Sequence, residues 1–187
     1  MAQLAGAGLR NGLAAVALGS VSTEHQITLE PMTHGEARSF LARSLSRLVE
    51  DLVELNGWDE TQALKRAKEM EKDVLPQHES TLGHEFRWIT SDSHRVGEVW
   101  YGPMIDDETM LYLWDIRVGE NHRGEGFGGA ALGAVAKAAQ DLQLKGVALT
   151  VLANNPNARR LYESKGYTVQ SEEDDRALMT LQVAPPT

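Results

Sequence analysis

A run of glycines with one arginine lies between a predicted strand and a predicted helix, and it carries the clearest chemistry of the chain. It reads Val118-Gly-Glu-Asn-His-Arg-Gly-Glu-Gly-Phe-Gly-Gly129. Glycines let backbone N–H groups approach a ligand closely because no Cβ is in the way. The start of a helix adds unpaired N–H donors and the positive end of its dipole. With the side chain of Arg123 added, the pattern predicts an anion site suited to a pyrophosphate.

Two nucleotide-binding motifs compete for this segment. Gly124, Gly126 and Gly129 match the Gly-x-Gly-x-x-Gly spacing of dinucleotide-binding proteins. That motif belongs to the first β-α-β unit and needs an acidic residue at the end of the next strand, but the next predicted strand ends in Leu-Ala-Asn at residues 152–154. A Walker A loop needs Gly-Lys-Ser/Thr after four spacers, and the chain has no such string. The sequence therefore disfavours NAD binding and contains no Walker A loop.

The same segment resembles the acetyl-CoA motif of the GNAT N-acetyltransferase superfamily. Arg123-Gly-Glu-Gly-Phe-Gly128 is similar to the family's Arg/Gln-x-x-Gly-x-Gly/Ala string, and Val118 stands where the family's fourth strand ends. Residues 155–167 are similar to its next signature, Asn-x-x-Ala-x-x-x-Tyr-x-x-x-Gly-Phe/Tyr. The two motifs follow in the family's order and at its spacing, so the clear resemblance covers residues 111–169.

The resemblance implies acetyl-CoA as cosubstrate and gives roles to residues of both motifs. Main-chain groups of residues 116–118 would pair with the pantetheine arm like an added strand. The loop amides would hold the pyrophosphate, and Asn155 would bond to the pantetheine, although it also suits a helix N-cap. Tyr162 would donate a proton to the leaving thiolate, or else serve as a core tyrosine. The implied cofactor-binding set is Ile116, Arg117, Val118, Arg123, Gly124, Glu125, Gly126, Phe127, Gly128, Gly129, Asn155, Ala158, Arg159 and Tyr162.

The group that removes the proton of the acceptor is less clearly marked. A lysine-like amine has a pKa near 10.4, so a carboxylate that takes its proton at pH 7 helps by about 10²–10⁴. Asp115 lies among apolar neighbours on the predicted strand 110–118 and is the first candidate, with a structural acceptor as the alternative interpretation. Glu98 on the preceding strand and Glu108 at the start of this one are further candidates.

The absence of cysteine constrains the mechanism. Without cysteine, a Cys acyl-enzyme, a disulfide framework and a zinc-thiolate site are excluded. We therefore expect a primary amine to attack the thioester directly in a ternary complex, with an oxyanion donor at or next to Val118. A catalytically silent CoA-binding regulatory or sensor module is the alternative function. The six histidines show no metal-ligand spacing, so we expect no metal site.

Hydrophobic periodicity places these motifs in a mixed α/β fold. Leucines at 41, 45, 48, 52 and 55 form one face of a helix, and the continuous apolar run 147–152 is typical of a strand covered on both faces. The predicted fold class is GNAT-like, with a mixed sheet of six to seven strands and about four helices. The predicted strands span 27–29, 84–90, 96–101, 110–118, 147–152, 167–170 and 177–183, and the predicted helices span 34–55, 59–75, 130–142 and 155–165.

Length and charge bound the organisation and the partners. The 187 residues suit one domain at 24–183, with a flexible extension at 1–23 and a frayed tail at 184–187. The apolar run 13–18 is short for a secretory signal and no run is long enough for a membrane span, so we expect a cytoplasmic protein. The net charge of −9 argues against nucleic-acid binding.

The charge is unevenly distributed, which bears on the acceptor. Residues 117–165 hold seven Lys/Arg and four Asp/Glu, a balance of +3, and the rest of the chain carries −9 − 3 = −12. An acidic exterior favours a cationic acceptor such as a polyamine, an aminoglycoside or a basic peptide, although net charge also serves solubility. Many members of the family dimerise, so a homodimer is among the expectations. Residues expected near the acceptor are Trp58, Glu79, Glu85, Trp88, Trp100 and Tyr112.

Overall fold

The computed structural model describes residues 25–184 and contains the predicted elements in the predicted order. Its strands are β1 (Ile27–Pro31), β2 (Glu85–Ser91), β3 (His94–Pro103), β4 (Met110–Val118), β5 (Gly146–Leu152), β6 (Thr168–Glu172) and β7 (Arg176–Gln182). Its helices are α1 (His34–Asn56), α2 (Glu60–Val74), α3 (Phe127–Asp141) and α4 (Pro156–Ser164), with 3₁₀ turns η1 (His78–Ser80) and η2 (Glu120–His122). The expected extension at 1–23 lies outside the described residues, as does most of the expected tail.

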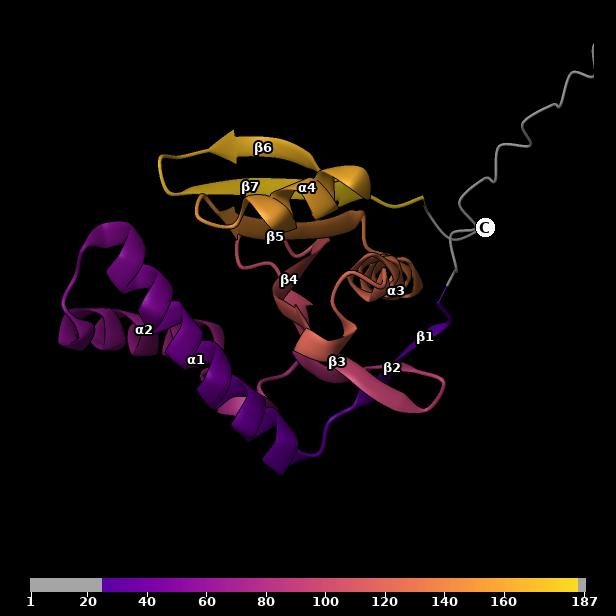
Figure 1. Ribbon diagram of the computed structural model, residues 1–187, viewed down its shortest axis with the longest axis horizontal. Coiled ribbons are helices and arrows are strands. Elements are labelled where there is room, and N and C mark those ends of the chain that lie inside the picture. The colour runs from indigo at the N-terminus through magenta and orange to yellow at the C-terminus, as the bar shows by residue number, and fades with distance from the viewer. Residues whose placement is uncertain (1–24, 185–187) are drawn as a thin grey trace, which may run out of the picture.

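The strands form one mixed sheet in the order β1-β2-β3-β4-β5-β7-β6, which confirms the predicted fold class. The pair β4 and β5 is parallel, and the other neighbouring pairs are antiparallel. The β4–β5 pairing covers only residues 110–112 and 146–148, although both strands continue beyond it. The sheet therefore opens between β4 and β5, and this opening positions the site (Figure 1).

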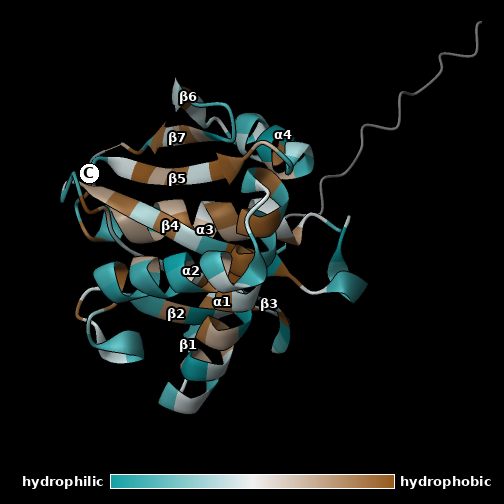
Figure 2. Cartoon of the chain, turned by 90° about the vertical axis from the view of Figure 1, so that its left-hand side faces the viewer, coloured by the Kyte–Doolittle hydropathy of each residue, from teal (hydrophilic) through white to brown (hydrophobic). Residues whose placement is uncertain are grey.

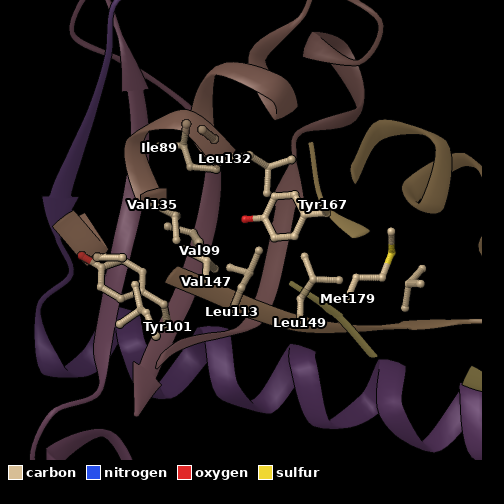
Figure 3. Packing of buried hydrophobic residues seen from close by; sticks show 14 of the residues in the cluster. Ile89, Val99, Tyr101, Leu113, Leu132, Val135, Val147, Leu149, Tyr167 and Met179 are labelled. Atoms are coloured by element: carbon tan, nitrogen blue, oxygen red, sulfur yellow. The ribbon is translucent and has the colours of Figure 1, made fainter. Parts of the chain in front are cut away.

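Helices cover both faces of the sheet. Helix α3 packs on one face, where Leu132 and Val135 meet Val99, Val147 and residues from other strands in the main core (Figure 3). Helices α1 and α2 lie on the opposite side of β4 from α3 (Figure 1). Apolar colouring is concentrated on β4, β5 and α3, whereas much of α1 and α2 is hydrophilic (Figure 2). No helix of residues 25–184 combines the length and the apolar character that a membrane crossing needs.

Helix α1 crosses the sheet, and its polar side chains contact successive strands. Glu36 accepts a hydrogen bond from Arg95 at the start of β3, Arg43 pairs with Glu98 further along β3, and Arg47 pairs with Asp115 of β4. Its N-terminus has a capping box in which Thr33 and Glu36 exchange hydrogen bonds. The sequence pattern put these arginines off the apolar stripe of the helix, and the structure places Arg43 and Arg47 in contacts with the sheet.

Helix α3 begins three residues earlier than the sequence predicted. It starts at Phe127, so that Gly128 and Gly129 lie in its first turn rather than before it. A Cβ at Gly129 would stand 2.4 Å from Lys165 Cε, and one at Gly128 would stand 3.2 Å from Leu161 Cδ2. These two glycines therefore allow α3 to pack closely against the C-terminal half of α4 and the residue after it, which the sequence pattern did not reveal.

Candidate active site

One large groove runs along the opening between β4 and β5. It has a volume of about 1220 Å³ and is lined by α1, α2, β4, the segment 122–129, β5, α4 and the start of β7. Pockets for a single small ligand usually measure roughly 300–1,000 Å³. The groove can therefore hold two ligands at once.

The glycine loop, residues 123–129, forms one end of this groove. Gly124 and Gly126 have φ angles of +79° and +93°, a backbone conformation that favours glycine. Gly126 caps α3, and no side chain bonds to the first turn of that helix, so its free N–H groups face the groove end. His25 Nε2 lies within hydrogen-bond distance of the carbonyl oxygen of Glu125, at 2.6 Å. This contact fixes the backbone of the loop at Glu125. The loop therefore has the backbone conformation that the sequence predicted for an anion site, and its binding role remains a prediction.

The edge of β4 forms one wall. Ile116, Arg117 and Val118 line the groove, and their strand has no pairing with β5 at this point. A strand edge without a partner presents free N–H and C=O groups. An extended chain that carries amides can add to such an edge, as the family resemblance implied for these three residues.

Helix α4 forms the opposite wall. Asn155 Oδ1 accepts a hydrogen bond from Ala158 N at 3.1 Å, which confirms the N-cap interpretation of this residue. Ala158 and Tyr162, one turn apart, line the groove together with Leu161. Burial and the negative charge of Asp115 raise the pKa of Tyr162 to about 12. Its hydroxyl therefore stays protonated at neutral pH and can donate a proton.

Asp115 reaches the groove because of a β-bulge. Trp100 pairs with Asp115 and Tyr101 with Leu113, so Trp114 is an extra residue in β4. Simple alternation would point Asp115 to the same face as Leu113, which is buried under α3; the bulge turns it toward α1 instead. Ser44 Oγ donates to Asp115 Oδ2 at 2.7 Å, and Arg47 Nη2 donates to the same oxygen.

The other carboxylate candidates lie elsewhere. Glu98 is buried, accepts a hydrogen bond from Arg43 Nη2 at 2.6 Å and lines a second, smaller cavity of about 610 Å³ rather than the groove. Glu108 is exposed in the turn before β4. The structure therefore brings Asp115, and neither glutamate, into the groove with Tyr162.

Two residues of the implied cofactor set, Arg159 and Glu125, do not line the groove. Arg159 pairs with Glu172 at 2.5 Å and with Glu163 at 3.1 Å, so its guanidinium is bound on the outer side of α4. Glu125 contributes its backbone to the loop, while its side chain lies 3.8 Å from His122. The pair with Glu163 is a local i,i+4 contact of helix α4, whereas the pair with Glu172 depends on how β6 packs beside that helix.

Of the six residues expected near the acceptor, three line the groove and three do not. Trp58, Trp100 and Tyr112 line the groove. Glu79 pairs with Arg38, Glu85 with Arg87, and Trp88 stacks under Arg95, so none of these three lines it.

Sequence reasoning also missed three groove residues on α1: Ser44, Arg47 and Asp51. Their spacing of three and four residues puts them on one helix face, and this was the available signal. The leucine stripe of the same helix is the stronger signal, and several of its leucines also line the groove. Within residues 25–184, no three His, Asp or Glu side chains gather closely enough to hold a metal ion.

Comparisons with protein families, with curated proteins and with solved structures all find acetyltransferases. Residues 47–167 match the acetyltransferase (GNAT) family. The chain is 27% identical over 144 residues to the uncharacterized N-acetyltransferase YdgE of Bacillus subtilis, covering 76% of this chain and 92% of that protein. The crystal structure of YycN from Bacillus subtilis superposes with a TM-score of 0.69 at 28% identity, covering 79% of this chain and 98% of YycN. Spermidine N-acetyltransferase from Vibrio cholerae, in complex with CoA and spermine, shares the fold with a TM-score of 0.60 at 18% identity, covering 84% of this chain and 95% of that one.

Proposed function

The chain belongs to the GNAT acetyltransferase family and is an N-acetyltransferase with acetyl-CoA as its cosubstrate, and we propose that it acetylates a primary amine by direct attack in a ternary complex. The observation that carries this proposal is the single groove with the glycine loop at one end and Asp115 and Tyr162 on facing walls. Its volume accommodates both substrates together. The absence of cysteine leaves no thiol to carry the acetyl group.

The residues of the groove fit acetyl-CoA. The uncapped first turn of α3 and the positive-φ glycines at 124 and 126 suit the pyrophosphate. The unpaired edge at residues 116–118 suits the amides of the pantetheine arm. Asn155 uses its oxygen for the N-cap and keeps its side-chain N–H groups for a ligand. Bound acetyl-CoA supplies an acetyl group activated as a thioester.

Asp115 is the proposed base. Both donors from α1, Ser44 Oγ and Arg47 Nη2, bond to its Oδ2. Its Oδ1 has no partner among the described residues, and Asp115 lines the groove. Ser44 and Arg47 therefore fix the carboxylate with Oδ1 as the oxygen that accepts the proton of the acceptor amine.

Tyr162 is the proposed acid. Its hydroxyl is half-buried on the wall opposite Asp115, and its raised pKa keeps the proton in place until a strong base appears beside it. A thiolate that leaves next to this hydroxyl can take the proton. Asp115 and Tyr162 thus divide the two proton transfers between the two walls of the groove.

Thiol release from acetyl-CoA over a panel of primary amines tests the proposal. We expect turnover with at least one amine, and native mass spectrometry with acetyl-CoA, CoA, NAD and ATP should show binding of the first two. Tight binding of NAD without CoA would overturn the proposal. A protein that binds acetyl-CoA but turns over no amine would instead be a CoA-binding sensor.

A further inference from the structure

The part of the groove between the helix pair α1–α2 and the sheet is a compartment of its own. Its floor is the face of β4 and β5 opposite α3, with Tyr112, Thr150 and Leu152. Tyr112 Oη donates to Thr150 Oγ1 at 2.6 Å, which fixes the floor across the two strands. We call this space the acceptor compartment; its wall includes Leu48, Asp51, Leu52, Leu55, Trp58 and Met70, together with the charged residues Arg66 and Glu71 of α2.

The wall of the acceptor compartment is mostly apolar. Leu48, Leu52, Leu55, Trp58 and Met70 are all half-buried, although each lies on or beside a helix that packs against its neighbour. Their remaining exposed surface faces the groove. A ligand that covers this surface removes apolar area from water, which favours an apolar body over a polar one.

Asp51 is the carboxylate of the wall that forms no ion pair among the described residues, whereas Glu71 lies 3.9 Å from His78. Asp115 pairs with Arg47 and Asp175 pairs with Arg176, but no cationic side chain of the described residues lies within 4 Å of Asp51. Its contact is the side-chain amide of Asn154, at 3.4 Å. Burial is the main reason that the pKa of Asp51 is raised; the charges of Glu54 and Glu50 add to the rise, and the hydrogen bond from Asn154 and the charge of Arg47 only partly oppose it. A cation beside this carboxylate would relieve that cost.

We propose that the acceptor is a primary amine on an apolar body, an alkyl or arylalkyl amine, whose chain lies against α1 and α2 while Asp51 receives its ammonium. This inference rests on the proposed function. Asp51 lies one turn of α1 beyond Arg47, about 6 Å along the helix axis, and Arg47 holds Asp115. The ammonium is therefore recognised next to the group that takes its proton. A polyamine or a basic peptide would leave the apolar wall uncovered.

Tryptophan fluorescence of the full chain measures this binding without turnover, because Trp58, Trp100 and Trp114 line the groove. We expect Kd to fall about fourfold per methylene from propylamine to hexylamine. Hexylamine should bind at least tenfold more tightly than hexanol, and Asp51→Asn should abolish that ratio. Leu52→Asn should make Kd nearly independent of the length of the alkyl chain. Val53 is the next residue and is exposed, so Val53→Asn should leave the dependence of Kd on chain length unchanged.

Three results would overturn the inference: spermidine binding more tightly than hexylamine, a Kd independent of chain length, or an amine-to-alcohol ratio unchanged by Asp51→Asn. The substitution Asp51→Asn is isosteric, which keeps this last test independent of folding. Thiol release with the same ligands separates the two proposals. Polyamine turnover without binding of alkyl amines defeats the inference alone, and length-dependent amine binding without thiol release defeats the proposed function alone.

Discussion

At the scale of residues, the site depends on two side chains in opposite electrostatic settings. Asp115 receives two hydrogen bonds, one of them from an arginine, and leaves its second oxygen for a ligand. Tyr162 is desolvated and lies near that carboxylate, and both effects favour its neutral form. These settings are the reason that we propose Asp115 as the base and Tyr162 as the acid.

Replacing Tyr162 by Phe should lower kcat by about 10²-fold, because the leaving thiolate loses its proton donor. The KM for acetyl-CoA should change by less than about threefold, since the ring that lines the groove is kept. Steady-state kinetics measures both. Because the pKa of Tyr162 is about 12, the wild-type rate should show no loss of this acid below about pH 10. Unchanged turnover in the variant would remove the acid role.

Asp115→Asn should lower kcat by about 10²–10⁴-fold, because the amide cannot take the proton of the acceptor amine, and steady-state kinetics measures this loss. Glu98→Gln is the matched comparison, since Glu98 also pairs with an arginine of α1 but lies outside the groove. A loss of kcat with the substitution at Glu98, and not with the one at Asp115, would transfer the role to Glu98.

At the scale of elements, glycines and one bulge set the geometry of the walls. The bulge at Trp114 turns the end of β4 so that Asp115 faces α1. Gly97 lets β3 and β4 approach closely, because a Cβ there would stand 2.4 Å from the carbonyl oxygen of Arg117. Gly133 is different: it lies in the middle of α3, and a Cβ added there would meet no neighbouring atom within 4 Å, so nothing in the packing requires it.

Gly133→Ala should raise the free energy of unfolding by about 0.5–1 kcal/mol, because alanine loses less backbone entropy in a helix. Gly97→Ala should lower it by several times that amount, since the clash is with backbone in the centre of the sheet. Urea denaturation of both variants measures the difference. Equal effects of the two substitutions would show that the close approach of β3 and β4 is not needed.

At the scale of the whole molecule, acidic side chains neutralise part of the positive charge of the basic segment 117–165. Arg159, inside the segment 117–165, is paired with Glu172, which lies outside it. The balance of +3 therefore overstates the positive field at the groove. Arg123 lines the glycine-loop end of the groove, whereas Arg159 and Arg160 of helix α4 do not line it.

The stability of the whole fold should fall as the pH drops from about 7 to about 5. His84 is half-buried and accepts a hydrogen bond from Trp100 Nε1 at 3.0 Å, and burial lowers its pKa. The unfolded chain then binds a proton near pH 6.5 that the folded chain resists, so stability is lost below that pH. Glu36, whose pKa is lowered to about 2, contributes only below about pH 4.5.

His84→Gln removes this titration while keeping an acceptor for Trp100. The free energy of unfolding of the variant, measured by urea titration at about pH 7 and about pH 5, should fall less than that of the wild type over this interval. His94→Gln, at an exposed position, is the control and should keep the wild-type slope. If the free energy of unfolding falls equally with pH in all three proteins, His84 does not cause the loss of stability.

Features that depend on neighbouring residues were predictable before the fold was known. The order of elements, the N-caps at Asp59 and Asn155 and the anion loop follow from periodicity and from side chains that bond three residues along the chain. These interactions are local, so their signals are continuous in the sequence. The family motifs are signals of the same kind.

The grouping of side chains in the groove, by contrast, emerged only from the folded chain. Asp115 faces α1 because its register with β3 contains a bulge, and alternation within β4 alone would have pointed it to the other face. Arg47, Asp51 and Tyr162 meet it from helices far along the chain, and Arg159 is drawn away by Glu172. The physical reason is that strand register and ion-pair choice are set by packing between distant segments, which leaves no period in the sequence to read.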